Sequence, residues 1–170
     1  MSRFLGAITY RCFAHSDVAE LAANSSVPVI NALSDKHHPC QAAADLMTII
    51  EQFPDNDGLK VAYIGDGNNV LHDLMLACAM VGIKIHYACP KGYEPSSDII
   101  ERAEEHAREN GSQVIGTNDP LEAVANANVI YTDVFVSMGE EGLKDKINDF
   151  EGFQVNSELV DNASNDWKFM

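Results

Sequence analysis

The sequence predicts an α/β fold in which a parallel β-sheet is flanked by helices. Short, apolar, β-prone runs at 59–64, 83–89, 113–116 and 128–133 alternate with longer helical stretches at 70–81, 96–110 and 119–127. This alternation is typical of a parallel sheet built through right-handed crossovers. The 170 residues, 46% of them hydrophobic, are also enough to bury the core that such a sheet needs.

Local signals mark the ends of these elements. The first run stops at the glycine-rich turn 65–67, and the second stops at Pro90. Ser97 or Asp98 is suited to cap the long charged helix, which Gly111 ends. Pro120 fits the first position of the next helix. We also predict a fifth strand at 153–156.

The first 53 residues follow a different pattern. A helix is expected at 17–23, a short extended run at 27–31 and a long amphipathic helix at 39–53. Proline opens that last helix and Pro54 follows its end, as the geometry of proline requires. The polar residues 55–58 then form a turn or linker between this part and the sheet.

Composition and charge exclude several classes of partner. Lys and Arg number 11 against 26 Asp and Glu, so the formal net charge is −15. Such a surface repels nucleic-acid phosphates and anionic lipid headgroups. No apolar run approaches the roughly 20 residues that a membrane span needs. The four cysteines are scattered, which is typical of reduced thiols in a cytoplasmic protein. A small-molecule substrate or another protein is the expected partner.

Two polar segments are expected at one edge of the sheet. Residues 65–69 and 133–138 each follow a predicted strand, and ligands of open parallel sheets bind beyond the carboxyl ends of the strands. A nicotinamide-type cofactor is disfavoured because the third glycine of its fingerprint is missing. Asn68 and Asn69 either bind a small polar ligand or merely cap the turn. Asp133 is suited to a substrate ammonium group, although it could equally cap a helix.

A second candidate group lies at the start of the long N-terminal helix. His38 and Gln41 are three residues apart, so they share one face at an end that favours an anionic or carbonyl ligand. The alternative is a histidine that simply closes the turn. No matching second cluster of ligands accompanies it, so a zinc site is disfavoured. Arg11 is either an anion ligand or a salt-bridge residue.

Taken together, these segments resemble the ornithine carbamoyltransferases of the aspartate/ornithine carbamoyltransferase family. The resemblance covers nearly the whole chain, and six motifs in one order carry it: 27–35, 38–45, 65–70, 91–95, 131–140 and 153–156. It implies a Rossmann-like ornithine-binding domain at 54–170, incomplete at its carboxyl end. Residues 1–53 then form the last part of a carbamoyl phosphate-binding domain, including the interdomain helix.

The resemblance also implies a reaction. A carbamoyl group passes from carbamoyl phosphate to the side-chain amine of ornithine, giving citrulline and phosphate, in a homotrimer with active sites between subunits and without a metal or organic cofactor. By the same resemblance, His38, Gln41 and Arg11 hold carbamoyl phosphate. The amino-acid end of ornithine is held by Asn69, Asp133, Ser137 and Met138. The same residues serve citrulline synthesis, as in arginine biosynthesis, or its reversal.

The sequence departs from the family pattern in several places. Ala32 replaces a usual glycine, Phe135 a frequent tryptophan, and Asp73 a frequent serine. The Ser-Thr-Arg-Thr-Arg phosphate loop and the His-Cys-Leu-Pro loop do not occur in the sequence. We therefore expect an internal fragment that is inactive by itself, because these loops supply much of the stabilising charge. The alternatives are a carbamoyltransferase for putrescine or an N-acylornithine, and a non-catalytic amino-acid-binding paralogue.

Overall fold

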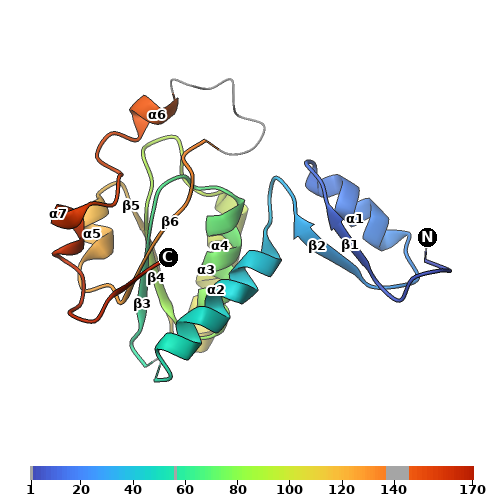
Figure 1. Ribbon diagram of the computed structural model, residues 1–170, viewed down its shortest axis with the longest axis horizontal. Helices are drawn as coiled ribbons and strands as arrows, with labels where there is room; N and C mark the ends of the chain where they lie inside the picture. Colours follow the sequence, from blue (N-terminus) through green and yellow to red (C-terminus); the bar gives the residue numbers. More distant parts are fainter. Residues whose placement is uncertain (1, 56, 137–145) are drawn as a thin grey trace.

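The computed structural model describes residues 2–55, 57–136 and 146–170, and its strands form two parallel sheets (Figure 1). The larger sheet has the order β5-β4-β3-β6-β7. Its strands are β3 (Lys60–Ile64), β4 (Lys84–Ala88), β5 (Val114–Thr117), β6 (Val129–Thr132) and β7 (Lys168–Phe169). The chain runs outward from β3 to β4 and β5, then returns to the other side of β3 as β6. The strand order therefore reverses between β3 and β6, which is where ligands bind in such sheets.

Helices cover both faces of the larger sheet (Figure 1). One face carries α2 (Pro39–Gln52), α3 (Asn69–Met80) and α4 (Ser97–Asn110), and the other carries α5 (Pro120–Val124) and α7 (Ser157–Val160). Side chains of β3 alternate between the two cores. Val61 and Tyr63 pack with α3, whereas Ala62 and Ile64 pack with α5, and all four are fully buried. This double cover confirms the predicted α/β fold.

A smaller unit precedes α2. It consists of β1 (Ile8–Arg11), α1 (His15–Ala23) and β2 (Val29–Leu33), and the two strands pair in parallel. The helical and extended runs predicted here are confirmed within a few residues, but sequence reasoning missed β1. Three of its four residues are exposed, so the strand lacks the apolar alternation that identifies a strand in a sequence.

The fifth strand of the larger sheet is not the predicted one. Residues 153–156 form no strand, because Phe153 closes a turn onto the carbonyl of Phe150 and the Asn156 side chain caps α7. β7 takes the edge instead, where Lys168 N–H donates to the carbonyl of Asn128 at 2.8 Å. A strand of two exposed residues is too short to show a pattern in the sequence.

Helix ends follow the sequence closely, with one correction. Ser96 is the N-cap residue of α4, rather than Ser97 or Asp98, and Gly111 ends the helix in a left-handed conformation with φ of 70°. A further short helix, α6 (Lys146–Asp149), lies before α7 in the chain. Within the described ranges, no helix combines the length and the apolar character that a bilayer crossing requires.

Candidate active site

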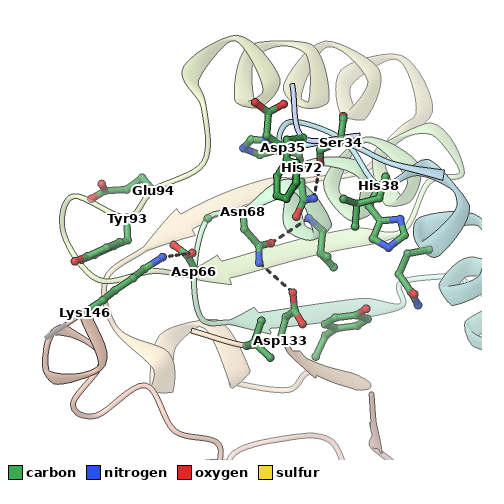
Figure 2. Close-up of a pocket in the computed structure, with 18 of the residues that line it drawn as sticks. Ser34, Asp35, His38, Asp66, Asn68, His72, Tyr93, Glu94, Asp133 and Lys146 are labelled. Atoms are coloured by element: carbon green, nitrogen blue, oxygen red, sulfur yellow. Dashed lines mark hydrogen bonds and ion pairs between the residues drawn. The ribbon is translucent and has the colours of Figure 1, made fainter. Parts of the chain in front are cut away.

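A cavity of about 750 Å³ opens at the carboxyl ends of β3 and β6 and is closed on its other side by the N-terminal unit. Its lining comes from five parts of the chain: β1 and β2, the start of α2, the turn after β3, the loop 92–94, and the end of β6 with Lys146. Figure 2 shows Asn68 and Asp133 in its middle, with His38 on one side and Lys146 on the other. The cavity lies where the strand order reverses.

The turn after β3 is shaped by a close backbone approach. Gly67 N–H donates to the carbonyl of Tyr93 at 2.9 Å, and a Cβ at Gly67 would lie 2.4 Å from the backbone nitrogen of Pro95. Only glycine fits there. The glycine of this motif therefore serves to pack the loop 93–95 beside the cavity.

Asn68 joins the start of α3 to the end of β6. Its Oδ1 accepts from the backbone N–H groups of Val70 and Leu71 at 3.0 and 3.2 Å, which caps the helix. Its Nδ2 donates to Asp133 Oδ2 at 3.0 Å. Because capping fixes which end of the amide faces the helix, the NH2 group must face Asp133 (Figure 2). Asn68 thus does more than cap the turn.

His38 enters the cavity from the start of α2, where it is the N-cap residue. Its Nδ1 is buried and has no hydrogen-bond partner among the described residues. Burial, and then the nearby Arg11 guanidinium, lower the pKa of His38, while Asp73, Asp133 and Asp45 oppose this. A neutral imidazole in the lining of the cavity is suited to hydrogen-bond a polar ligand.

Gln41 lies about one turn further along α2, and Asp45 holds its side chain. Its Nε2 donates to Asp45 Oδ1 at 2.8 Å, and the Tyr131 hydroxyl donates to Asp45 Oδ2 at 3.0 Å. Burial raises the pKa of Asp45, and these two donors counteract that effect. The chain Tyr131–Asp45–Gln41 therefore ties α2 to the end of β6 beneath the cavity.

A buried ion pair closes the opposite wall. Lys146 Nζ lies 2.7 Å from Asp66 Oδ2, and the two residues are 6% and 8% exposed. The ammonium also lies 5.3 Å from the centre of the Tyr93 ring, within range of a cation–π contact. Sequence reasoning missed Lys146, because nothing in the sequence links it to a turn 80 positions earlier.

The cavity brings together five of the seven residues that the resemblance assigns to the substrates. Arg11, His38, Gln41, Asn69 and Asp133 all line it. The predicted Ser137 and Met138 lie outside the described residues. Across residues 2–55, 57–136 and 146–170, no group of three or more His, Cys, Asp or Glu side chains is arranged to hold a metal ion.

Comparison with known families accounts for almost the whole chain. A profile described as the Asp/Orn binding domain of aspartate/ornithine carbamoyltransferase matches residues 57–170, and one described as the carbamoyl-P binding domain matches residues 1–51. The chain belongs to the aspartate/ornithine carbamoyltransferase family. Members of this family are carbamoyltransferases, which confirms the resemblance read from the motifs.

Individual members agree with this assignment. A Thermoplasma volcanium protein named "Ornithine carbamoyltransferase, catabolic" is 52% identical over 171 residues, which cover all of this chain and 56% of that protein. A Bacillus cereus ornithine carbamoyltransferase is 49% identical and is covered to 54%. The solved structure of the Pyrococcus furiosus ornithine carbamoyltransferase matches 99% of this chain and 54% of its own, with 48% identity and a TM-score of 0.95. The chain therefore spans about half the length of the relatives it matches.

Proposed function

We propose that the protein containing this chain transfers the carbamoyl group of carbamoyl phosphate to the side-chain amine of ornithine. The amine nitrogen attacks the carbonyl carbon, the bond from that carbon to the phosphate oxygen breaks, and the amine loses a proton. The products are citrulline and phosphate. The supporting observation is that one cavity is lined by Arg11, His38 and Gln41 on one side and by Asn69 and Asp133 on the other.

On the carbamoyl phosphate side, we assign His38 and Gln41 to the carbonyl oxygen and Arg11 to the phosphate. Negative charge develops on that oxygen when the amine attacks, so donors already aimed at it lower the barrier. The position of His38 in the cavity lining and the tethered amide of Gln41 support this assignment. Arg11 supplies the positive charge that a phosphate needs in an otherwise acidic chain.

On the ornithine side, we assign Asp133 to the α-ammonium group. Its carboxylate lines the cavity and is fixed by Asn68, and ornithine offers it a cation that putrescine lacks and that N-acylation neutralises. Asn69, Ser137 and Met138 are assigned to the same end of the substrate. These contacts favour free ornithine over the related amines.

Domain organisation, assembly, location and the direction of the reaction are proposed as well. We propose residues 1–53 as part of the carbamoyl phosphate domain and 54–170 as the ornithine domain, in a cytoplasmic homotrimer without a metal or organic cofactor. We propose citrulline synthesis, as in arginine biosynthesis, as the working direction. The Thermoplasma volcanium relative is named catabolic, so citrulline breakdown is the alternative direction to be tested.

The test is an assay of the complete reading frame that contains this chain. We expect citrulline from ornithine and carbamoyl phosphate, and much less product from putrescine or N-acetylornithine. Light scattering should give the mass of a trimer. The isolated 170-residue chain should give no citrulline, because its sequence holds neither of the two loops named above. Absence of citrulline from the complete protein, or equal turnover of putrescine, would contradict the proposal.

A further inference from the structure

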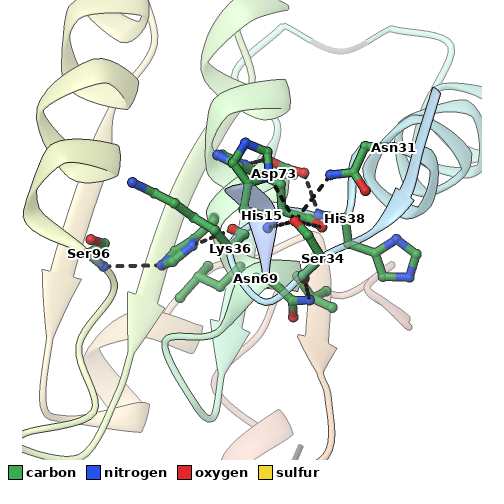
Figure 3. Close-up of polar contacts among 12 residues, drawn as sticks. His15, Asn31, Ser34, Lys36, His38, Asn69, Asp73 and Ser96 are labelled. Carbon is green, nitrogen blue, oxygen red and sulfur yellow. Dashed lines mark hydrogen bonds and ion pairs between the residues drawn. The ribbon is translucent and has the colours of Figure 1, made fainter. Parts of the chain in front are cut away.

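One face of α3 holds the loop that leads to His38 (Figure 3). This loop, residues 34–38, joins β2 to α2 and has no regular structure of its own. Asn69 Nδ2 donates to the carbonyl of Ser34 at 2.7 Å, and His72 Nδ1 lies 2.9 Å from the carbonyl oxygen of Lys36. Asp73 Oδ2 accepts from the backbone N–H of His38 at 2.6 Å.

The spacing of these contacts is regular. Asn69, His72 and Asp73 stand at positions i, i+3 and i+4 of α3, which places them on one face of the helix. They contact every second residue of the loop, from Ser34 to His38. We call these three residues the α3 clamp.

A hydrogen bond from the N-cap residue of α4 holds one member of the clamp, His72, in place. His72 Nε2 accepts from the backbone N–H of Ser96 at 3.1 Å, so its Nδ1 must carry the proton that is donated to Lys36. Burial lowers the pKa of His72, which keeps the ring in the neutral form that this arrangement needs. The loop is thus fixed relative to two helices of the larger sheet.

Asp73 makes the contacts nearest to the cavity. While one carboxylate oxygen accepts from His38 N–H, the other lies 2.6 Å from His37 Nδ1, and the side chain is only 10% exposed. A carboxylate can only accept, so His37 carries its proton on Nδ1. His38 itself offers α2 no side-chain cap, and Asp73 brings a negative charge to that end of the helix.

We infer that Asp73 is a positioning residue for His38, resting on the role proposed for His38 above. The described residues offer no hydrogen bond to Nδ1 of the His38 ring, so the backbone at the start of α2 sets where the ring points. That backbone is fixed by Asp73 and, two residues earlier, by His72. Asp73 does not line the cavity and therefore acts through His38.

Asp73→Ala and Asp73→Asn distinguish the loss of the two contacts from the loss of the negative charge. Asp73→Ala removes both contacts, and we expect kcat of the complete protein to fall about 10- to 100-fold with little change in the KM for ornithine. Asp73→Asn can keep both, because its oxygen accepts from His38 N–H and its NH2 group donates to His37 Nδ1. Asn should therefore recover most of the rate and move the His37 proton to Nε2.

Asp98→Asn is the matched control. Asp98 contacts the same loop through Lys36 at 2.6 Å, but from the solvent side, and its loss removes the same charge. We expect kcat to stay within about twofold of the unaltered protein, because a surface ion pair contributes little.

Two kinds of measurement distinguish a failure of the positioning role from a failure of the proposed function. Nitrogen-15 NMR of the histidine rings reports the His37 tautomer and the environment of the His38 ring without any turnover. If the unaltered protein makes no citrulline, the proposed function fails, and an unchanged His38 ring signal in Asp73→Ala would overturn the positioning role as well. If citrulline forms, the role is overturned when Asp73→Ala matches Asp98→Asn in kcat. Should Asp73→Ala not fold, Asp73→Leu, which keeps the approximate size of the side chain but neither contact, takes its place under the same two criteria.

Discussion

The two sides of the cavity rest on regions of very different construction. The Asp133 side stands on the larger sheet, where all of β3 from Val61 to Ile64 is fully buried between helices. The His38 side consists of the start of α2 and of Arg11, which ends a two-stranded sheet whose β1 and β2 expose Tyr10 and Ile30. The His38 side therefore cannot rely on a core of its own to position its side chains. It depends on contacts from α3, α2 and the strand ends.

The buried ion pair in the wall opposite His38 should matter most for stability. Lys146→Met removes the ammonium beside the buried Asp66 carboxylate, and we expect a loss of about 3–5 kcal/mol in the free energy of unfolding. Chemical denaturation measures it. Adding Asp66→Asn to Lys146→Met should restore much of the loss, and a double variant as unstable as the single one would contradict this explanation.

A paired substitution tests the contrast between the two regions directly. Ile64→Ala empties a fully buried site between β3 and α5, and should cost about 2–5 kcal/mol in the free energy of unfolding. Ile30→Ala in β2 removes a side chain that is 45% exposed, and should cost about 0.5 kcal/mol or less. Equal losses in thermal or denaturant unfolding would mean that the two regions are equally well packed.

Asn68→Asp tests the Asp133 side of the cavity alone. An Asp side chain still caps α3, but it loses the NH2 group that donates to Asp133 and adds a like charge beside it. We expect the KM for ornithine to rise about tenfold, equal to about 1.4 kcal/mol, while the KM for carbamoyl phosphate changes little. Melting temperature serves as the control, and an unchanged KM for ornithine would show that Asn68 only caps the helix.

Stability should also depend on pH. Burial lowers the pKa of His72, and that of His86 on β4 to about 4, so the unfolded chain binds more protons than the folded chain between the two pKa values of each group. The free energy of unfolding should therefore fall as the pH drops below about 6.5. His86→Gln should flatten this slope without affecting the loop 34–38, and a slope of the opposite sign would contradict the burial of both rings.

The same contrast explains what the sequence could predict. Periodicity and turn residues placed β3, α3, β4, α4 and β6, because these elements bury regular apolar patterns. The weakly patterned β1 and β7 could not be predicted, since most of their residues are exposed. The predicted strand at 153–156 is wrong because tertiary packing of Phe153 and the cap at Asn156 prevail there.

The site divides in a similar way. His38, Gln41 and Asp133 could be identified because motifs after a strand or before a helix mark them. Lys146 and the role of Asp73 could not, because each depends on a contact between distant parts of the chain, 80 positions apart for Lys146 and Asp66, and 35 for Asp73 and His38. Asp73 was noticed only as a departure from the family pattern, and the structure supplies its contacts.

We propose that two half-sites, one on each region, meet in a single cavity. Steady-state kinetics of Asp133→Asn and Arg11→Gln in the complete protein test this arrangement. We predict that Asp133→Asn raises the KM for ornithine about tenfold or more and that Arg11→Gln does so for carbamoyl phosphate, each with little effect on the other substrate. If each variant raised both KM values equally, or neither changed either value, the division of the cavity into two half-sites would be contradicted.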